Sequence, residues 1–324
     1  MIDPTRWRHL VADMPLVVLD TETTDADAAE CGVCEFAAIL FDAAAIEAAI
    51  AACVPPQDER GVWQVALPAP TFETATRLHP GRPISPGATA VHGIRDEDVA
   101  ACPGIDAIAG MLGGVAAGHR VAGYNSGRFD LPVLGRLTSV AFPNALDIMG
   151  VVAAARMLPA PAGKLPWDLG GAAQMLGLAN FKNKLGAVHA AMRGRQFEGA
   201  HGALADCRAG ADVLFALLAI YPDLPAAGPA LAAAAARALC MVQPVAGVPT
   251  FTVGKHEGVS VANVEMSDAG YIGWLLDADD MDEATKNAVI EVIGEARATQ
   301  ILQSRRAPKP GRGRKPKGAQ GVAA

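Results

Sequence analysis

Two carboxylates one residue apart follow a short, strongly apolar stretch near the start of this chain. The stretch covers residues 16–19 (LVVL), and Asp20 and Glu22 come directly after it. Four apolar residues, two of them β-branched, predict a buried strand, in which residues i and i+2 point to the same face. Two carboxylates on one face repel each other and lose hydration, so a cation between them would stabilise both. Carboxylate oxygens suit hard divalent ions. The alternative is a strand end that carries two solvated acids.

Two further aspartates stand where helices are predicted to begin. Asp130 follows a predicted short strand at residues 121–125 and starts a helical pattern. Asp206 lies at the start of the amphipathic pattern of residues 203–218, five positions after His201. Most aspartates at helix starts are caps or solvated side chains, so neither residue is specific alone. The order along the chain is informative: Asp-x-Glu on a strand, Asn…Phe-Asp at a helix start, and His-x4-Asp on a late helix.

The elements that must position these side chains alternate between strands and helices. A second strand is predicted at residues 35–41, antiparallel to the first, and a third at residues 74–78. Residues 43–73 mix a helix-like piece with prolines, and we interpret them as an insertion between these strands. Further helical patterns cover residues 104–118, 144–158 and 168–178.

The composition argues against a membrane-spanning or secreted protein. Hydrophobic residues make up 51% of the 324 positions, but many are alanine, and no run of eighteen strongly apolar residues is free of charges and breakers. The N-terminus has no signal-peptide apolar core. Six cysteines without regular spacing indicate reduced thiols, and the lone Cys31-x-x-Cys34 pair lacks a second pair for zinc. We therefore expect a cytoplasmic protein with Cys31 and Cys34 at a strand edge.

Basic residues gather at the C-terminus. Seven of the 27 lysines and arginines follow Ser304, and the 20 that remain face 34 acidic residues. An acidic body with a basic tail rich in proline and glycine favours a polyanionic partner held by the tail. A solubilising end is the alternative. Residues 312–316 (RGRKP) also resemble the core of an AT-hook, a short and unspecific match.

Together the motifs resemble the DEDDh group of 3′→5′ exonucleases, which includes the DNA polymerase III proofreading subunit and ribonuclease T. The resemblance covers residues 14–220 and rests on DTETT at 20–24, GYNSGRFD at 123–130 and HGALADC at 201–207. Residues 82–94 and 201–207 are similar to exodeoxyribonuclease X-like proteins in particular. Residues 251–276 resemble the small C-terminal module of those proteins, for which we expect a glycine-punctuated hairpin and an aromatic-rich helix.

The resemblance implies a two-metal mechanism with Mg²⁺, or Mn²⁺ in its place. Asp20 would bridge both ions, while Glu22 and Asp206 would hold the ion beside the attacking water. Asp130 would lie in the first or second shell of the other ion. His201 would be the general base that takes the proton of that water.

Four residues are predicted to contact the substrate. Thr21 and Thr24 flank the first two acids. His92 either approaches the 3′ end of the substrate or only fixes its own loop. Asn125 belongs to the second motif, but it precedes the aspartate by five residues, as in exonuclease I, whereas most of the group has four. This departure leaves the role of Asn125 and the strand preference open.

We therefore predict an α/β, ribonuclease H-like fold with a mixed five-stranded sheet and helices on both faces, plus a small α+β C-terminal module. The predicted boundaries are an exonuclease domain at 1–222, a linker with a connecting helix at 223–247, the module at 248–304 and a basic disordered tail at 305–324.

The predicted function is a metal-dependent 3′→5′ exodeoxyribonuclease that acts on single-stranded or frayed DNA 3′ ends and releases nucleoside 5′-monophosphates, in DNA repair or replication at the nucleoid. An exoribonuclease would use the same acids and histidine. A non-catalytic adaptor that recruits nucleic acid or a polymerase is the other alternative. The five catalytic positions argue against an adaptor, and the C-terminal module favours DNA. DNA 3′ ends are the expected partner, with further DNA contact by the tail, and the sequence identifies no protein partner.

Overall fold

The computed structural model divides into two compact units, residues 1–240 and 241–324. The described residues are 2–55, 65–159, 184–193, 201–252, 254–278, 281 and 283–306. The helix predicted at residues 168–178 and the basic tail after Arg306 lie outside them.

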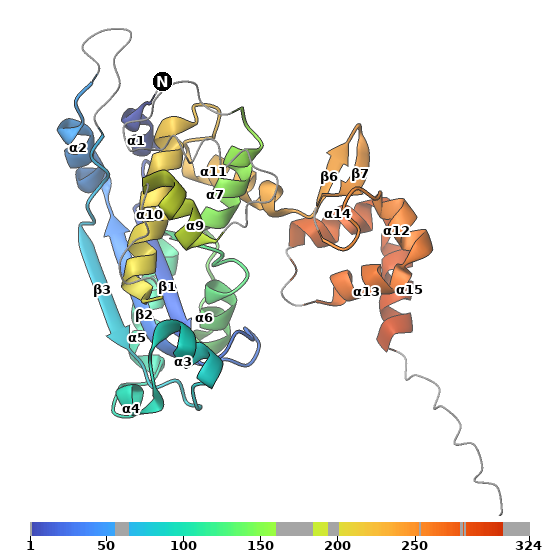
Figure 1. Cartoon of the computed structure of the whole chain (residues 1–324), viewed down its shortest axis with the longest axis horizontal. Helices are drawn as coiled ribbons and strands as arrows, with labels where there is room; N and C mark the ends of the chain where they lie inside the picture. Colours follow the sequence, from blue (N-terminus) through green and yellow to red (C-terminus); the bar gives the residue numbers. More distant parts are fainter. Residues whose placement is uncertain are drawn as a thin grey trace, which may run out of the picture. The chain divides into compact units, whose positions relative to one another are not determined.

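The first unit is built on a mixed five-stranded sheet with the strand order β3-β2-β1-β4-β5 (Figure 1). The strands are β1 (Leu16–Thr23), β2 (Val33–Phe41), β3 (Phe72–Arg77), β4 (Arg120–Gly123) and β5 (Ala145–Asp147). β2 pairs antiparallel with both β1 and β3, whereas β4 pairs parallel with β1 and β5. This arrangement confirms the predicted ribonuclease H-like sheet, and it brings the C-terminal ends of β1, β4 and β5 to one edge.

Helices cover both faces of this sheet. On one face, Leu16 and Val18 of β1 join a large apolar core that includes most of α10. On the other, Leu19 and Val121 pack with helices α5 and α6. The helices of this unit are η1 (Pro4–Arg6), α1 (Trp7–Leu10), α2 (Ala43–Ala52), α3 (Pro86–His92), α4 (Asp96–Val99), α5 (Asp106–Gly118), α6 (Asp130–Thr138), α7 (Ile148–Arg156), α9 (Leu185–Arg193), α10 (Ala203–Ile220) and α11 (Gly228–Leu239).

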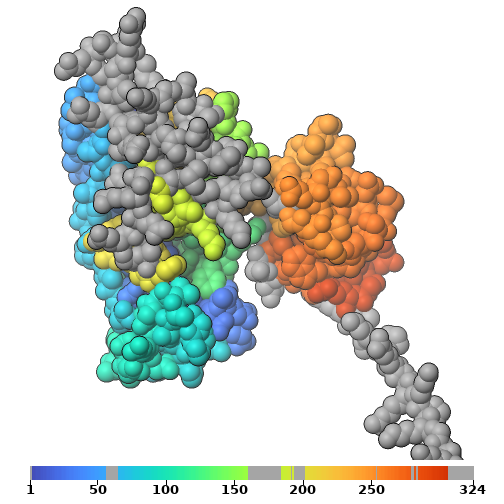
Figure 2. Space-filling view, in the orientation of Figure 1, coloured from blue at the N-terminus to red at the C-terminus, as the bar shows by residue number. Residues whose placement is uncertain are grey.

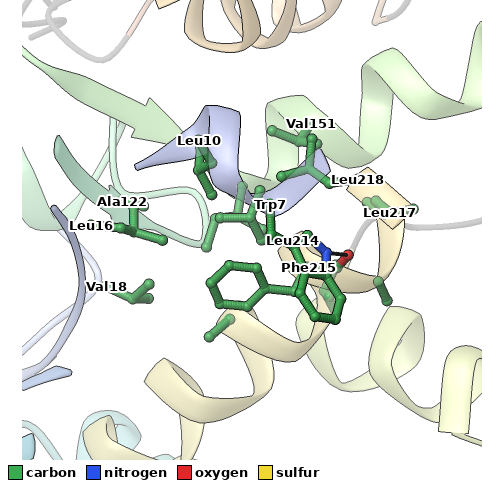
Figure 3. Close-up of a cluster of buried hydrophobic side chains, with 14 of the residues drawn as sticks. Trp7, Leu10, Leu16, Val18, Ala122, Val151, Leu214, Phe215, Leu217 and Leu218 are labelled. Atoms are coloured by element: carbon green, nitrogen blue, oxygen red, sulfur yellow. Dashed lines mark hydrogen bonds between the residues drawn. The ribbon is translucent and has the colours of Figure 1, made fainter. Parts of the chain in front are cut away.

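The N-terminal segment fixes the far end of α10. Trp7 is fully buried, its ring meets that of Phe215 edge-on with 5.8 Å between centroids, and its Nε1 donates to the Phe215 carbonyl at 2.8 Å (Figure 3). The Arg6 guanidinium donates to carbonyl groups at the C-terminal end of the same helix. Removing a buried tryptophan from such a core costs about 3–5 kcal/mol. The helix that carries Asp206 is therefore held firmly at its distal end.

The segment predicted as a linker is not a separate segment. Most of it forms α11, whose Leu231 and Ala235 are buried in the core of the first unit. This helix approaches α7 so closely that a Cβ on Gly150 would lie 2.7 Å from the Ala235 carbonyl oxygen. The boundary between the two units falls after Cys240, so the predicted linker at 223–247 is divided between them. Alanine-rich composition is common to linkers and to closely packed helices, and this explains the difference.

Residues 144–158, predicted as one helical pattern, form a strand and a helix. Ala145, Leu146 and Asp147 pair with β4, and α7 begins only at Ile148. Asp147 is the N-cap of α7, where its side chain accepts from the amide of Met149 at 2.9 Å. A strand of three residues is too short to show a periodicity of two.

The second unit combines a hairpin with helices. Its elements are β6 (Val242–Val245), β7 (Val248–Phe251), α12 (Val261–Ser267), α13 (Ala269–Asp277), α14 (Glu283–Ile293) and α15 (Glu295–Arg306). The hairpin turn is Ala246-Gly247, and both residues have positive φ, as a tight primed turn requires. The hairpin thus precedes the glycine-rich loop 254–258 instead of containing it, and the predicted aromatic-rich helix is α13.

Among the described residues, no helix combines the length and the apolar character that crossing a membrane requires.

Candidate active site at the end of the first strand

Three carboxylates converge where β1 ends. Asp20 and Glu22 lie on the sheet face that α10 covers, and Asp206 lies in the first turn of that helix. One carboxylate oxygen from each of the three residues lies within 4.8 Å of the others. In the described part of the chain, this is the one group of three acidic, histidine or cysteine side chains placed closely enough to share a metal ion.

The fourth predicted acid lies beside this group. Asp130 begins α6 and is 4% exposed. Its Oδ1 accepts hydrogen bonds from the Thr21 amide at 3.0 Å and from the Thr21 hydroxyl at 2.6 Å. Its charge is among those that raise the pKa of Asp20. The structure therefore brings together all four carboxylates that the sequence analysis singled out, and we call Asp20, Glu22, Asp130 and Asp206 the acid cluster.

Burial and mutual repulsion raise the pKa values of these carboxylates. Burial, followed by the charge of Asp206, raises the pKa of Glu22 to about 8. Burial and the neighbouring carboxylates raise the pKa of Asp20 well above its ordinary value. Burial also raises the pKa of Asp130 to about 6, against the opposing effect of the Thr21 hydrogen bonds. Burial raises the pKa of Asp206 as well. Each of these shifts would reverse next to a positive charge.

A divalent cation fits this donor set. The converging ligands are carboxylate oxygens, which Mg²⁺ and Mn²⁺ prefer. None of Asp20, Glu22 and Asp206 forms an ion pair with a basic side chain among the described residues. Asp20, Glu22 and Asp206 would hold such an ion, with Asp130 beside them.

The predicted general base, His201, lies just before the N-cap of α10. His201 is exposed and has φ +66°, a left-handed conformation that residues other than glycine seldom adopt. Burial raises the pKa of Asp206, while the charge of the His201 ring and then the His201 backbone act in the opposite direction. The two predicted residues of the third motif thus lie together, with the imidazole open to solvent. Unusual backbone conformations of this kind gather at functional sites.

The hydroxyl groups of the two predicted threonine contacts have partners within the protein. Thr21 donates to Asp130, as described above. Thr24 is 1% exposed, and its Oγ1 accepts from the amide of Gly32 at 3.0 Å. These bonds position the acids and the loop that follows β1. A substrate contact by Thr21 or Thr24 stays a prediction.

His92 anchors its own loop against the end of β1. Its Nε2 lies 3.1 Å from the Thr23 carbonyl oxygen, and its Nδ1 accepts from the amide of Ile94 at 3.0 Å. His92 is the last residue of α3, which lies on the surface at the lower end of the first unit in Figure 2. The contacts match the loop-fixing alternative for this residue, and its approach to a substrate stays a prediction.

Asn125 lies in a turn that a further aspartate holds. Asp147, which the sequence analysis did not single out, accepts from the amides of Asn125 and Gly127, both at 3.1 Å. In the described part of the chain, the hydrogen bonds of Asn125 go to Asp147 and Arg128 and not to the acid cluster. The turn leads directly into Asp130. An aspartate between a short apolar pair and a helical pattern was the available signal for Asp147.

Glu35 is a second residue that sequence reasoning missed. It lies directly opposite Glu22 in the β1–β2 ladder. Its Oε2 accepts from the amide of Ala203 at 3.0 Å, and its Oε1 lies 2.8 Å from Nε of Arg77. The N-cap of α10 is Gly202, which has no side chain, so Glu35 caps this helix from a neighbouring strand. The signal was a single acid at the start of an otherwise apolar predicted strand.

The solved structures to which part of this chain is similar include exonucleases. Escherichia coli exonuclease I, in a zinc-bound complex with single-stranded DNA, is 18% identical, with 65% of this chain and 42% of that chain covered and a TM-score of 0.48. Exonuclease I from Methylocaldum szegediense is 22% identical, with 65% and 41% covered and a TM-score of 0.47. The match thus spans about two fifths of the length of these exonucleases. No curated protein sequence matches this chain.

A family match covers the residues that build the site. Residues 17–214 match the exonuclease family RNase_T, a span that includes all four acids, His201 and Glu35. This span is more than half of the chain. The protein therefore belongs to the RNase_T family of exonucleases, within the DEDDh group that its motifs resemble.

Proposed function

We propose that this exonuclease hydrolyses DNA in the 3′→5′ direction, from single-stranded or frayed 3′ ends, with Mg²⁺ or Mn²⁺, and releases nucleoside 5′-monophosphates. The observation that carries the proposal is the convergence of Asp20, Glu22 and Asp206 within 4.8 Å. The raised pKa of Glu22, about 8, supports a role for this group as a cation site. A purely structural cluster of acids would be stabilised by basic side chains.

The residues of the site divide the work of hydrolysis. Bound divalent ions would neutralise charge on the reacting phosphate and make water more acidic. Asp20, Glu22 and Asp206 would hold the ions, and Asp130 is fixed beside these residues by Thr21. His201 takes the proton of the attacking water, a task that suits imidazole near neutral pH. As the water oxygen bonds to phosphorus, the bond from phosphorus to the 3′ oxygen breaks.

The choice of DNA rests on the resemblance of residues 251–276 to the module of exodeoxyribonuclease X-like proteins. The basic tail beyond Ser304 supports a further contact with the DNA backbone. Location at the nucleoid stays a prediction.

The proposal is tested by following the decay of 3′- and 5′-labelled single-stranded DNA, duplex DNA and RNA with Mg²⁺, Mn²⁺ or a chelator. Asp20→Asn and His201→Ala are compared with two controls of the same residue types, Asp106→Asn on α5 and His9→Ala on α1, both exposed outside the site. We expect stepwise loss from DNA 3′ ends that requires metal, is abolished by Asp20→Asn and is strongly reduced by His201→Ala. Both controls should cleave like the wild type.

Other outcomes separate the alternatives. Faster decay of RNA than of DNA would keep the site and overturn the substrate. Loss of label from 5′ ends would overturn the direction. Absence of cleavage with either metal, combined with tight DNA binding, would favour the adaptor.

A further inference from the structure

A row of charged side chains extends the acid cluster across the sheet. Glu22, Glu35 and Arg77 are direct cross-strand partners on three adjacent strands. Directly paired residues of antiparallel strands project from the same face. Because neighbouring strands lie about 4.8 Å apart, the backbone of Arg77 is about 10 Å from that of Glu22. The row therefore ends in a cation close to the proposed site of cleavage.

Glu35 holds this cation by one nitrogen. The Arg77 Nε lies 2.8 Å from Glu35 Oε1, and the other oxygen of Glu35 accepts from the start of α10. Among the described residues, the two Nη groups of Arg77 have no hydrogen-bond partner, and its side chain is 42% exposed. The guanidinium is thus oriented by a carboxylate that is itself fixed to the helix of Asp206.

Two other arginine–glutamate pairs of the first unit use two nitrogens of the guanidinium. On the same sheet edge, Arg208 of α10 uses both Nε and Nη2 on Glu73 of β3. At the opposite end of the sheet, Arg8 uses both Nε and Nη2 on Glu47. In both pairs one carboxylate binds Nε and an Nη group together, whereas Glu35 lies against only the Nε of Arg77.

The charge of Arg77 affects the pKa of two groups near the site. It lowers the pKa of Glu22 in the acid cluster, and it also lowers the pKa of His92 at the end of α3. The guanidinium therefore lies within electrostatic range of both the acids and the end of α3.

We propose that Arg77 binds a backbone phosphate of the polynucleotide, next to the linkage that is cleaved, and that Glu35 orients it. This inference rests on the proposed exonuclease function. A planar guanidinium with free Nη groups presents paired donors to two phosphate oxygens, which a lysine ammonium does not do. A polynucleotide held at a second phosphate would be positioned as well as bound.

Kinetics on labelled single-stranded DNA test this role, with Arg77→Gln, Arg77→Lys and the control Arg8→Gln. Arg8 is an ion-paired arginine of similar exposure whose partner is Glu47 and not a residue of the site. For Arg77→Gln we expect KM to rise roughly tenfold with kcat nearly unchanged, since a charged hydrogen bond is lost without loss of a catalytic group. The slope of log affinity against log salt should fall by about 0.7, one phosphate contact to a single strand. Arg77→Lys should keep the slope and lose part of the affinity, and Arg8→Gln should change neither. Circular dichroism checks that each variant is folded.

Substrates with one neutral methylphosphonate linkage locate the contact. In the wild type, KM should rise when the neutral linkage occupies one particular position near the 3′ end, and Arg77→Gln should be insensitive at that position alone. If the wild type degrades DNA and Arg77→Gln retains its KM, salt slope and methylphosphonate pattern, the inference is wrong. If the wild type cleaves nothing, fluorescence anisotropy with the same oligonucleotides still decides the point. A binding loss in Arg77→Gln would then uphold the phosphate contact while the proposed function fails, and equal binding would overturn both.

Discussion

Acidic side chains in the two units of this protein stand in opposite relations to cations. In the first unit, Asp20 and Glu22 lie among other carboxylates, and the pKa of Glu22 is raised to about 8 by burial and by these charges. In the second, Asp268 accepts from Lys255 Nζ at 2.7 Å, from His256 Nε2 at 3.1 Å and from the Tyr271 amide at 3.1 Å. The hydrogen bond from Lys255 is the main cause that lowers the pKa of Asp268 to about 2.

The difference separates a structural acid from an acid that lacks a partner. Asp268 is the N-cap of α13. Its hydrogen-bond partner His256 packs edge-on against Tyr271, with 4.6 Å between the ring centroids. These bonds join the glycine-rich loop to a helix. Among the described residues, Asp20, Glu22 and Asp206 form no such ion pair, so a cation from solution would supply their counter-charge.

The largest expected effect is a difference in kcat between substitutions of an acid in each unit. Asp206→Asn should reduce kcat on the order of 10³-fold or more, because it removes a charged ligand of the proposed cation site. Asp268→Asn should leave kcat unchanged. Single-turnover cleavage of labelled DNA at saturating metal measures both. Equal losses in the two variants would show that the second unit takes part in catalysis.

The second prediction concerns stability against pH in the absence of metal. Between the ordinary pKa of 4.5 and the folded value of about 8, Glu22 binds more protons in the folded state than in the unfolded state. The free energy of unfolding therefore falls as pH rises through this window, by about 3 kcal/mol for this residue. Urea unfolding in a chelator at pH 5 and pH 8 measures the fall. Glu22→Gln should flatten it, and added Mg²⁺ should restore stability at pH 8. A metal-free protein of equal stability at both pH values would contradict the prediction.

Glu35 is an intermediate case, a carboxylate of the same region that has partners. Glu35→Ala should destabilise the first unit by about 1 kcal/mol, since α10 loses its cap, and it should lower kcat because Asp206 lies in that first turn. Glu35→Gln keeps an acceptor for the Ala203 amide and should retain stability and kcat. Urea unfolding and cleavage rates of the two variants give the comparison. If glutamine impaired kcat as severely as alanine, Glu35 would be a metal ligand and not a cap.

The smallest expected effect lies in the second unit. Asp268→Ala should lower the unfolding midpoint of that unit, because α13 loses its N-cap and Lys255 and His256 lose their acceptor. The pH dependence should have the opposite sign to that of the acid cluster. Asp268 has a lowered pKa, so its contribution is complete above pH 4 and is lost as pH falls towards 2. Thermal unfolding between pH 2 and pH 6, compared with the wild type, tests both statements.

Local patterns made the acids and their strand predictable. An apolar run that ends in alternating carboxylates determines both the strand and the face that Asp20 and Glu22 share. The positions of Asp130 and Asp206 follow from helix starts in a fixed order along the chain. The mixed five-stranded sheet follows from the same alternation of strands and helices.

Features that depend on distant contacts were not predictable. The role of Glu35 requires the register of β2 against β1 and the arrival of a helix 168 positions later. The role of Asp147 requires the return of β5 beside β4. The packing of α11 depends on the close fit of Gly150 to Ala235, which composition alone does not reveal.

The cap on α10 has a consequence for unwanted cleavage of nucleic acid by partly unfolded molecules. A nuclease that stayed active while partly open would threaten any nucleic acid it met. Here the amide of Ala203 bonds to a side chain on β2, so separating helix from sheet at this point removes the cap and withdraws Asp206 from Asp20 and Glu22 in one event. We expect a molecule in which α10 has separated from the sheet to lose nuclease activity before it unfolds completely. Nuclease activity would therefore report that the sheet and α10 are still joined.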